Sequence, residues 1–145
     1  MKTIFPKKKY HKPKWFIIDA TNKTLGRLAS EASRLLMGKK NTFFTHGVDQ
    51  GHFVIIYNAE NVLVSGKKTY QKSYFRNSQR PGSLKIETYV KLKNRIPCRI
   101  IEKAVWGMLP KGILGRMYYR RLYVYSKKDI EDKDFLLNDK WLKYE

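Results

Sequence analysis

A run of nineteen residues, Lys67–Lys85, contains six basic side chains and no acidic one. Tyr70, Tyr74 and Phe75 are interleaved with these bases. Lysine and arginine bind phosphates, whereas an aromatic or guanidinium plane stacks on an unpaired base, so the run predicts RNA binding. A solvated charged surface is the alternative interpretation, and the absence of acids disfavours it. For the aromatics a structural alternative stays open, because Tyr74 or Phe75 can anchor the segment on the core.

Basic residues also gather in an N-terminal arm, at the two ends of a predicted helix, and in a second acid-free segment, Lys111–Arg121. The start of a helix offers free backbone N–H groups that favour an anion, which adds to the charge there. The predicted RNA-binding residues are Lys8, Lys9, Lys12, Lys14, Arg27, Lys39, Lys40, Lys67, Lys68, Lys72, Tyr74, Arg76, Arg80, Lys85, Lys111, Arg116, Arg120 and Arg121. This distribution suits a protein embedded in folded RNA more than one that reads a groove with a single helix.

Patterns for catalysis or metal binding are weak. Gly107–Gly112 has the spacing of a phosphate-binding loop, but the Lys and the Ser or Thr that must follow are missing. His46 and His52 flank Asp49 in a predicted loop, and their spacing matches no standard metal motif. Asp19 is the best single acid/base candidate, although a polar cap at a strand end is the commoner role. These weak patterns disfavour an enzyme, and we expect no metal, no cofactor and no small-molecule substrate.

The composition restricts the possible partners. The 145 residues carry a formal charge of +19; residues 126–145 have six acids and five lysines, so residues 1–125 carry +20. With 42% hydrophobic residues the chain can bury a core, and its charge calls for nucleic acid or an anionic membrane as partner. Cys98 is the single cysteine, which excludes an internal disulfide. No apolar run approaches the ~20 residues of a membrane span, and none at the N-terminus is long enough for a secretory signal.

Apolar patterns predict the elements that position these bases. Continuous apolar runs predict buried strands at 15–18, 53–57, 62–64 and 122–125. Stripes at helical period predict a helix from a Thr24 cap to Gly38 and another after Pro97, with a shorter helix at 86–95. Segments 66–82 and 111–121 are predicted as loops. Alternating strands and helices favour an α/β fold.

Several of these segments resemble one family in order along residues 15–125. The resemblance rests on Trp15–Ala20, Lys23–Ala29, Val54–Glu60, Gly66–Lys68, Arg80–Gly82, Ala104–Lys111 and Leu114–Arg116, and the family is ribosomal protein L13 of the large subunit. Lys85–Thr88 and Arg95–Pro97 are most similar to its cyanobacterial and chloroplast branch.

The resemblance implies a three-layer α/β/α domain around a four-stranded, mainly parallel sheet. It also implies binding to 23S-type rRNA early in large-subunit assembly, contacts with neighbouring ribosomal proteins, and no catalysis. We expect a basic arm at residues 1–14, the L13-like domain at 15–125 and a C-terminal extension at 126–145. The Lys-, Asn-, Ile- and Tyr-rich composition favours a plastid stroma over a bacterial cytoplasm.

The sequence departs from the family pattern at three places. Asn77 stands where the family has His, Trp106 stands where it has Lys, and residues 126–145 replace its usual tail. Because phosphate repels the tail's acids, we expect a short amphipathic element there, with apolar residues at near-helical spacing. It should dock on protein, either on this domain's own surface or on a neighbour in the subunit; a disordered extension is the alternative. An RNA-modifying enzyme, another non-ribosomal RNA-binding protein and a membrane-surface polycation are the rival functions.

Overall fold

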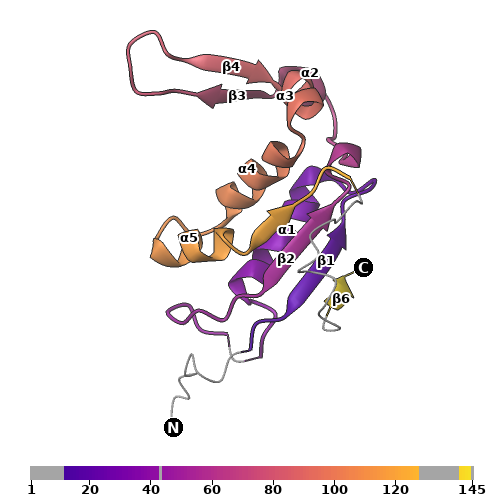
Figure 1. Cartoon of the computed structure of the whole chain (residues 1–145), viewed down its shortest axis with the longest axis vertical. Helices are drawn as coiled ribbons and strands as arrows, with labels where there is room; N and C mark the ends of the chain where they lie inside the picture. The colour runs from indigo at the N-terminus through magenta and orange to yellow at the C-terminus, as the bar shows by residue number, and fades with distance from the viewer. Residues whose placement is uncertain (1–11, 43, 128–140, 145) are drawn as a thin grey trace.

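The computed structural model describes residues 12–42, 44–127 and 141–144. Its main sheet consists of β1 (Trp15–Asp19), β2 (Phe53–Tyr57), β5 (Leu122–Val124) and β6 (Trp141–Tyr144) in the order β5-β2-β1-β6 (Figure 1). Each neighbouring pair is parallel, and Ile18 of β1 lies opposite Ile56 of β2. The predicted α/β class and parallel sheet are confirmed.

Two long helices cover one face of this sheet. Helix α1 (Leu25–Met37) and helix α4 (Cys98–Met108) contact each other and bury their apolar stripes against the strands. The core they share includes the fully buried Leu28, Ile56 and Ile101. Burial of apolar surface is the main stabilising contribution here, at roughly 25 cal/mol per Å².

Helix α1 begins and ends where predicted, between Thr24 and Gly38, but Thr24 does not cap it with its side chain. Gly38 adopts φ 73°, and its N–H reaches the carbonyl groups of Arg34 and Leu35, which closes the last turn. Thr24 precedes the helix, but its side chain makes no capping hydrogen bond. The Thr24 backbone instead forms a single parallel bridge with Leu63. Residues 62–64 therefore do not form the predicted strand, and the short 3-10 helix Ala59–Asn61 lies just before them.

The opposite face of the sheet carries Ile17, Ile55 and Tyr123, which occupy equivalent positions on three strands. Ile55 is fully buried, yet it lies outside the main core cluster. The helices of the described part of the chain pack on the other face, so the third layer of an α/β/α arrangement is not confirmed there. That layer remains a prediction from the resemblance.

Segment 66–82, predicted as a loop, contains a short helix and the first strand of a β-hairpin. Helix α2 (Lys68–Gln71) leads into β3 (Ser73–Arg76), which pairs antiparallel with β4 (Lys85–Thr88). Helix α3 (Tyr89–Arg95) follows β4 directly, so the predicted helix at 86–95 begins three residues later than expected. In Figure 1 the hairpin extends away from the main sheet at one end of the molecule.

Segment 111–121 contains a second difference from the sequence-based prediction. Helix α5 (Ile113–Tyr119) replaces the predicted loop, and its Tyr118 is buried in the core. A Cβ on Gly115 would lie 1.7 Å from the Pro110 carbonyl oxygen, so glycine is required where this helix passes close to the backbone before it. Gly115, one of the two glycines that suggested a loop, therefore permits close packing.

The C-terminal residues join the sheet as its edge strand. Residues Trp141–Tyr144 form β6 and pair with β1, Trp15 lying opposite Trp141. Residues 141–144 thus dock on this domain's own sheet, one of the two docking surfaces expected for the tail, but as a strand rather than at helical spacing. Phe135, Leu136 and Leu137 lie outside the described residues. No helix of the described ranges is long and apolar enough to span a membrane.

Candidate nucleic-acid interface

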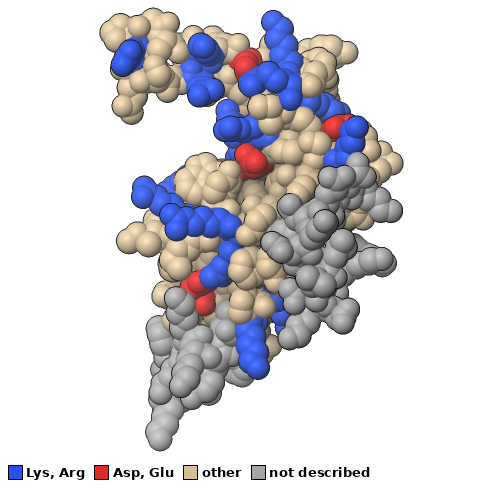
Figure 2. Space-filling view, viewed as in Figure 1, with Lys and Arg blue, Asp and Glu red and all other residues tan. Residues whose placement is uncertain are grey.

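Most predicted RNA-binding cations are exposed. Those exposed within the described ranges are Lys12, Lys14, Arg27, Lys39, Lys40, Lys67, Lys68, Lys72, Arg76, Arg80, Lys85, Lys111, Arg116 and Arg120. Lys8 and Lys9 lie outside the described residues. Figure 2 shows Lys and Arg side chains from the hairpin down to the lower part of one face, with few acids among them. An extended positive surface of this kind attracts a polyanion.

The hairpin alternates its side chains between two faces, as its pleat requires. Tyr74 and Arg76 lie opposite Glu87 and Lys85, and all four line a cleft shared with α3 and α4. On the other face Phe75 lies opposite Ile86, and these side chains are 61% and 59% exposed. One face of the hairpin is therefore charged and the other is apolar.

Side-chain hydrogen bonds order the hairpin turn. The amide oxygen of Asn77 accepts from the Gln79 N–H at 2.9 Å, and the Ser83 hydroxyl oxygen accepts from the Ser78 N–H at 3.2 Å. Gln79 and Gly82 both adopt positive φ, at 66° and 73°. Asn77, which stands where the family has His, therefore uses its side-chain carbonyl within the turn. The ordered turn leaves Arg80 exposed to solvent.

Tyr74 is half-buried and packs against the hydrophobic core. Its hydroxyl is buried and, among the described residues, has no hydrogen-bond partner. Burial, and to a lesser degree Tyr89, raises the pKa of Tyr74 to about 12. Lys72 and Lys103 place their ammonium groups 5.5 and 5.0 Å from its ring centroid. The anchoring alternative therefore holds for Tyr74, whereas Phe75 and the 83% exposed Tyr70 remain open to a base.

Arg121 is part of the fold rather than of the exposed surface. Its Nη1 donates to Asp49 Oδ1 at 2.8 Å, and Nη2 donates to Oδ2 of the same carboxylate. The Arg121 and Asp49 side chains are only 19% and 5% exposed, and the guanidinium also lies 5.6 Å from the Phe53 ring. We predicted that Arg121 binds RNA because it lies in a basic run. That run does not show that Asp49, 72 residues away, pairs with Arg121 in the folded chain.

The candidate metal and acid/base residues are also structural. His52 Nδ1 accepts from the Lys14 N–H at 3.2 Å, and Nε2 lies 3.0 Å from Asn41 Oδ1, so both ring nitrogens are used. Asp19 accepts hydrogen bonds from the Thr21 N–H and hydroxyl and from Asn58. Burial raises the pKa of Asp19, but these hydrogen bonds and one with Tyr57 outweigh it, and the net pKa is lowered. In the described ranges no cluster of metal-ligating side chains occurs.

Sequence reasoning missed three basic residues, Arg95, Arg99 and Lys103, which line the hairpin cleft. Arg99 and Lys103 are one helical turn apart on α4, at i and i+4, and this spacing could have indicated from the sequence that they share one face of the helix. They were overlooked because acidic Glu102 lies among them, which breaks the acid-free pattern.

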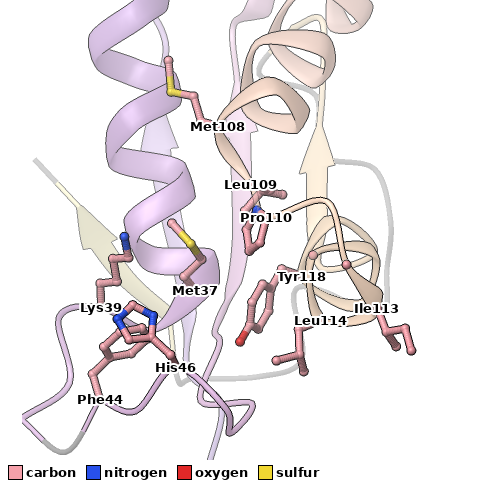
Figure 3. A pocket seen from close by; sticks show the side chains of 12 residues that line it. Met37, Lys39, Phe44, His46, Met108, Leu109, Pro110, Ile113, Leu114 and Tyr118 are labelled. Carbon is pink, nitrogen blue, oxygen red and sulfur yellow. The ribbon is translucent and has the colours of Figure 1, made fainter.

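A second concave region is apolar. Its volume is about 570 Å³, and it lies between the C-terminal end of α1, the segment around Phe44 and His46, and α5 (Figure 3). Met37, Leu114 and Tyr118 lie among its lining side chains, and Lys39 is at its edge. Its described lining includes no carboxylate. The Gly107–Gly112 segment begins in the last turn of α4 and runs to the start of α5, so it does not follow a strand as a phosphate-binding loop does.

Comparison with known proteins identifies relatives over most of the chain. The sequence model of a family described as "Ribosomal protein L13" matches residues 13–131. A "Large ribosomal subunit protein uL13" of Synechococcus sp. (strain CC9902) is 54% identical over 112 residues, which cover 77% of this chain and 75% of the relative. The protein of the same name from Crocosphaera subtropica is 54% identical over 124 residues, covering 86% and 82%. That of Prochlorococcus marinus is 52% identical over 125 residues, covering 86% and 83%.

Proposed function

Because the chain belongs to the ribosomal protein L13 family, we propose that it is a structural constituent of a large ribosomal subunit, where it binds and orders rRNA. The observation that carries the proposal is the set of exposed cations, which come from the arm, both ends of α1, the hairpin and α5. A protein that touches RNA from so many elements suits a place inside folded RNA. The family is structural, and the protein is not an enzyme.

We propose that the RNA is 23S-type rRNA and that the contacts form early in subunit assembly. The contact residues are the exposed cations named above, together with Lys8 and Lys9 of the arm. Arg121 and Tyr74 are left out, because one is paired with Asp49 and the other anchors the hairpin. Phosphate contacts position a protein on RNA, and the exposed Phe75 and Tyr70 add stacking surfaces.

The finer parts of the proposal concern organisation and location. We propose that residues 1–14 form a basic arm, 15–125 the L13-like domain and 126–145 an extension whose last residues complete the sheet edge. Neighbouring ribosomal proteins complete its surroundings. We place the protein in a plastid ribosome, on the cyanobacterial relatives and on the Lys-, Asn- and Ile-rich composition.

A sucrose gradient of a lysate from the source cells tests the function. The protein should sediment with large subunits and with whole ribosomes, as detected by an antibody against it. Recovery only in the soluble protein fraction would contradict the proposal. A gradient of ribosomes from purified plastids, run beside one from the remaining lysate, tests the location.

A further inference from the structure

A cleft of about 350 Å³ separates the charged face of the hairpin from helices α3 and α4. Arg76 and Lys85 face it from β3 and β4, and Arg99 and Lys103 face it from α4. The two walls come from segments that the intervening α3 brings together. The cleft therefore exists only in the folded chain, and no single basic run in the sequence marks it.

The charges around this cleft are unbalanced. Its one lining acid, Glu87, is already occupied, because Arg95 Nη2 donates to both of its oxygens at 2.8 and 2.7 Å. Arg99 lies 4.0 Å from Glu102, which is a loose and exposed pair. Within the described residues, Arg76, Lys85 and Lys103 have no ion-pair partner. A concave surface lined by one sign of charge raises the local concentration of anions.

The Arg95–Glu87 pair also has a geometric role. It joins the end of α3 to β4 across eight residues, through side chains that are 54% and 39% exposed. On the hairpin wall Tyr74 packs against the core, and the Lys103 ammonium from α4 lies 5.0 Å from its ring centroid. The two walls are therefore linked by one ion pair and one cation–π contact, neither of which brings an acid to Arg76, Lys85 or Lys103.

We propose that this cleft binds the phosphodiester backbone of one rRNA strand, with Arg99 and Lys103 on one wall and Arg76 and Lys85 on the other. The proposal rests on the function proposed above and extends it to residues outside the basic runs. The volume is at the small end of ligand pockets, so the cleft admits a backbone segment and excludes a duplex.

The hairpin favours a polymer over a free anion. Lys72, Arg76 and Arg80 follow one another from its base to its tip, and four residues of strand span about 13 Å. A single phosphate ion reaches only one of these positions, whereas successive phosphates of a strand reach all of them. The exposed Phe75 on the other face of the hairpin adds a stacking surface for a base of the same RNA.

The test removes the helix wall of the cleft. The double variant Arg99→Gln/Lys103→Gln loses two exposed charges, and circular dichroism checks that it remains folded. We measure the Kd for in-vitro transcribed 23S-type rRNA across a range of KCl concentrations. Loss of two phosphate contacts should weaken binding and lower the log–log salt slope by about 1.4 to 1.8. The matched control, Arg34→Gln/Lys91→Gln, removes the same charge from exposed positions outside the cleft and should leave the slope unchanged.

A second variant, Arg76→Gln/Lys85→Gln, tests the hairpin wall and should lower the slope equally. If the salt slope of Arg99→Gln/Lys103→Gln equals that of the control variant while the wild type binds tightly, the cleft does not bind RNA and the proposed function is left intact.

Unchanged affinity for naked rRNA with reduced retention in subunits would identify an acidic protein segment as the ligand instead. Competition by millimolar inorganic phosphate at constant ionic strength would identify a free anion, and would also overturn the proposal. Failure of the wild type to bind rRNA would contradict the proposed function itself.

Discussion

At the scale of single residues, neighbouring arginines have different roles. Arg121 is bonded to the buried Asp49, which also accepts from the Gly51 N–H at 3.1 Å, whereas Arg120 is exposed. Breaking a buried ion pair by removing one partner leaves an uncompensated charge. Exposed arginines with no such partner contribute little to folding and remain available to phosphate.

We therefore expect Arg121→Gln to lower the free energy of unfolding by about 3 kcal/mol, as measured by urea denaturation. Its neighbour provides the control. Arg120→Gln should change stability by less than about 0.5 kcal/mol, and it should lower the salt slope of rRNA binding by about 0.7 to 0.9. Equal stability of the two variants would contradict the structural role of Arg121.

Tyr74 predicts an alkaline limit to stability. Burial raises its pKa from 10.0 to about 12, so between these values the folded protein binds a proton that the unfolded chain has released. The contribution of Tyr74 to the free energy of unfolding should therefore be constant below pH 10 and fall as the pH rises toward 12. Burial also raises the pKa of Tyr89, Tyr118 and Tyr119, which act in the same direction.

The variant Tyr74→Phe should reduce this loss without abolishing it. Because the Tyr74 hydroxyl is buried without a partner in the described structure, its removal should leave stability at pH 7 unchanged or raise it by about 1 kcal/mol. Thermal denaturation at pH 7 and at pH 11 measures both effects. Strong destabilisation at pH 7 would show that the hydroxyl has a bonding role.

At the scale of elements, the hairpin carries an anchoring residue and exposed cations on the same face. Tyr74 anchors it, while Lys72, Arg76 and Arg80 are exposed. Replacing all three cations by Ala should weaken rRNA binding and lower the salt slope by about 2.1 to 2.7, with little change in melting temperature. A filter-binding titration in KCl and a calorimetric scan measure the two quantities. A collapsed melting temperature with an unchanged slope would assign these residues to the fold.

The edge strand β6 makes the tail part of the sheet. It pairs with β1 over four residues, and it covers an edge that is otherwise free to pair with another chain. A chain that ends at residue 127 lacks β6 and its backbone hydrogen bonds to β1. Its free energy of unfolding should therefore be lower by about 2 kcal/mol. The tail acids Asp129, Glu131, Asp132 and Asp134 repel phosphate, so affinity for naked rRNA should not fall.

Ribosome incorporation should be measured separately for this truncation, with a chain that ends at Tyr144 as the control. Reduced retention in the complete subunit, with unchanged naked-rRNA affinity, agrees with a docked tail. A large loss of rRNA affinity would show that the tail lysines touch RNA, and the charge argument would be wrong.

At the scale of the whole molecule, the charge is divided between a body of +20 and a tail of −1. Each cation that neutralises a phosphate releases counterions, so binding through many cations is tight at low salt and falls steeply as salt rises. We expect the protein to remain on large subunits through a moderate KCl wash. Each charge-removing variant above should be released at lower KCl, in proportion to the contacts it loses. Release of wild type and variants at the same KCl concentration would show that protein contacts dominate retention.

The sequence by itself determined the α/β class, the two main helices, three strands and the strongly basic character of the body. These features follow from local periodicity and charge. A continuous apolar run such as 53–57 predicts a buried strand without knowledge of distant residues. The family resemblance extended this reading to the ribosome.

Only the tertiary structure decided which basic and aromatic residues face a ligand. Asp49 withdraws Arg121 from the surface, Tyr74 turns inward while Phe75 turns outward, and α3 brings Arg99 and Lys103 opposite the hairpin. The edge strand β6 and helix α5 were missed for the same physical reason. Each depends on contacts with residues distant in the sequence, with β1 for the strand and with the core around Tyr118 for the helix, and these contacts override local pattern.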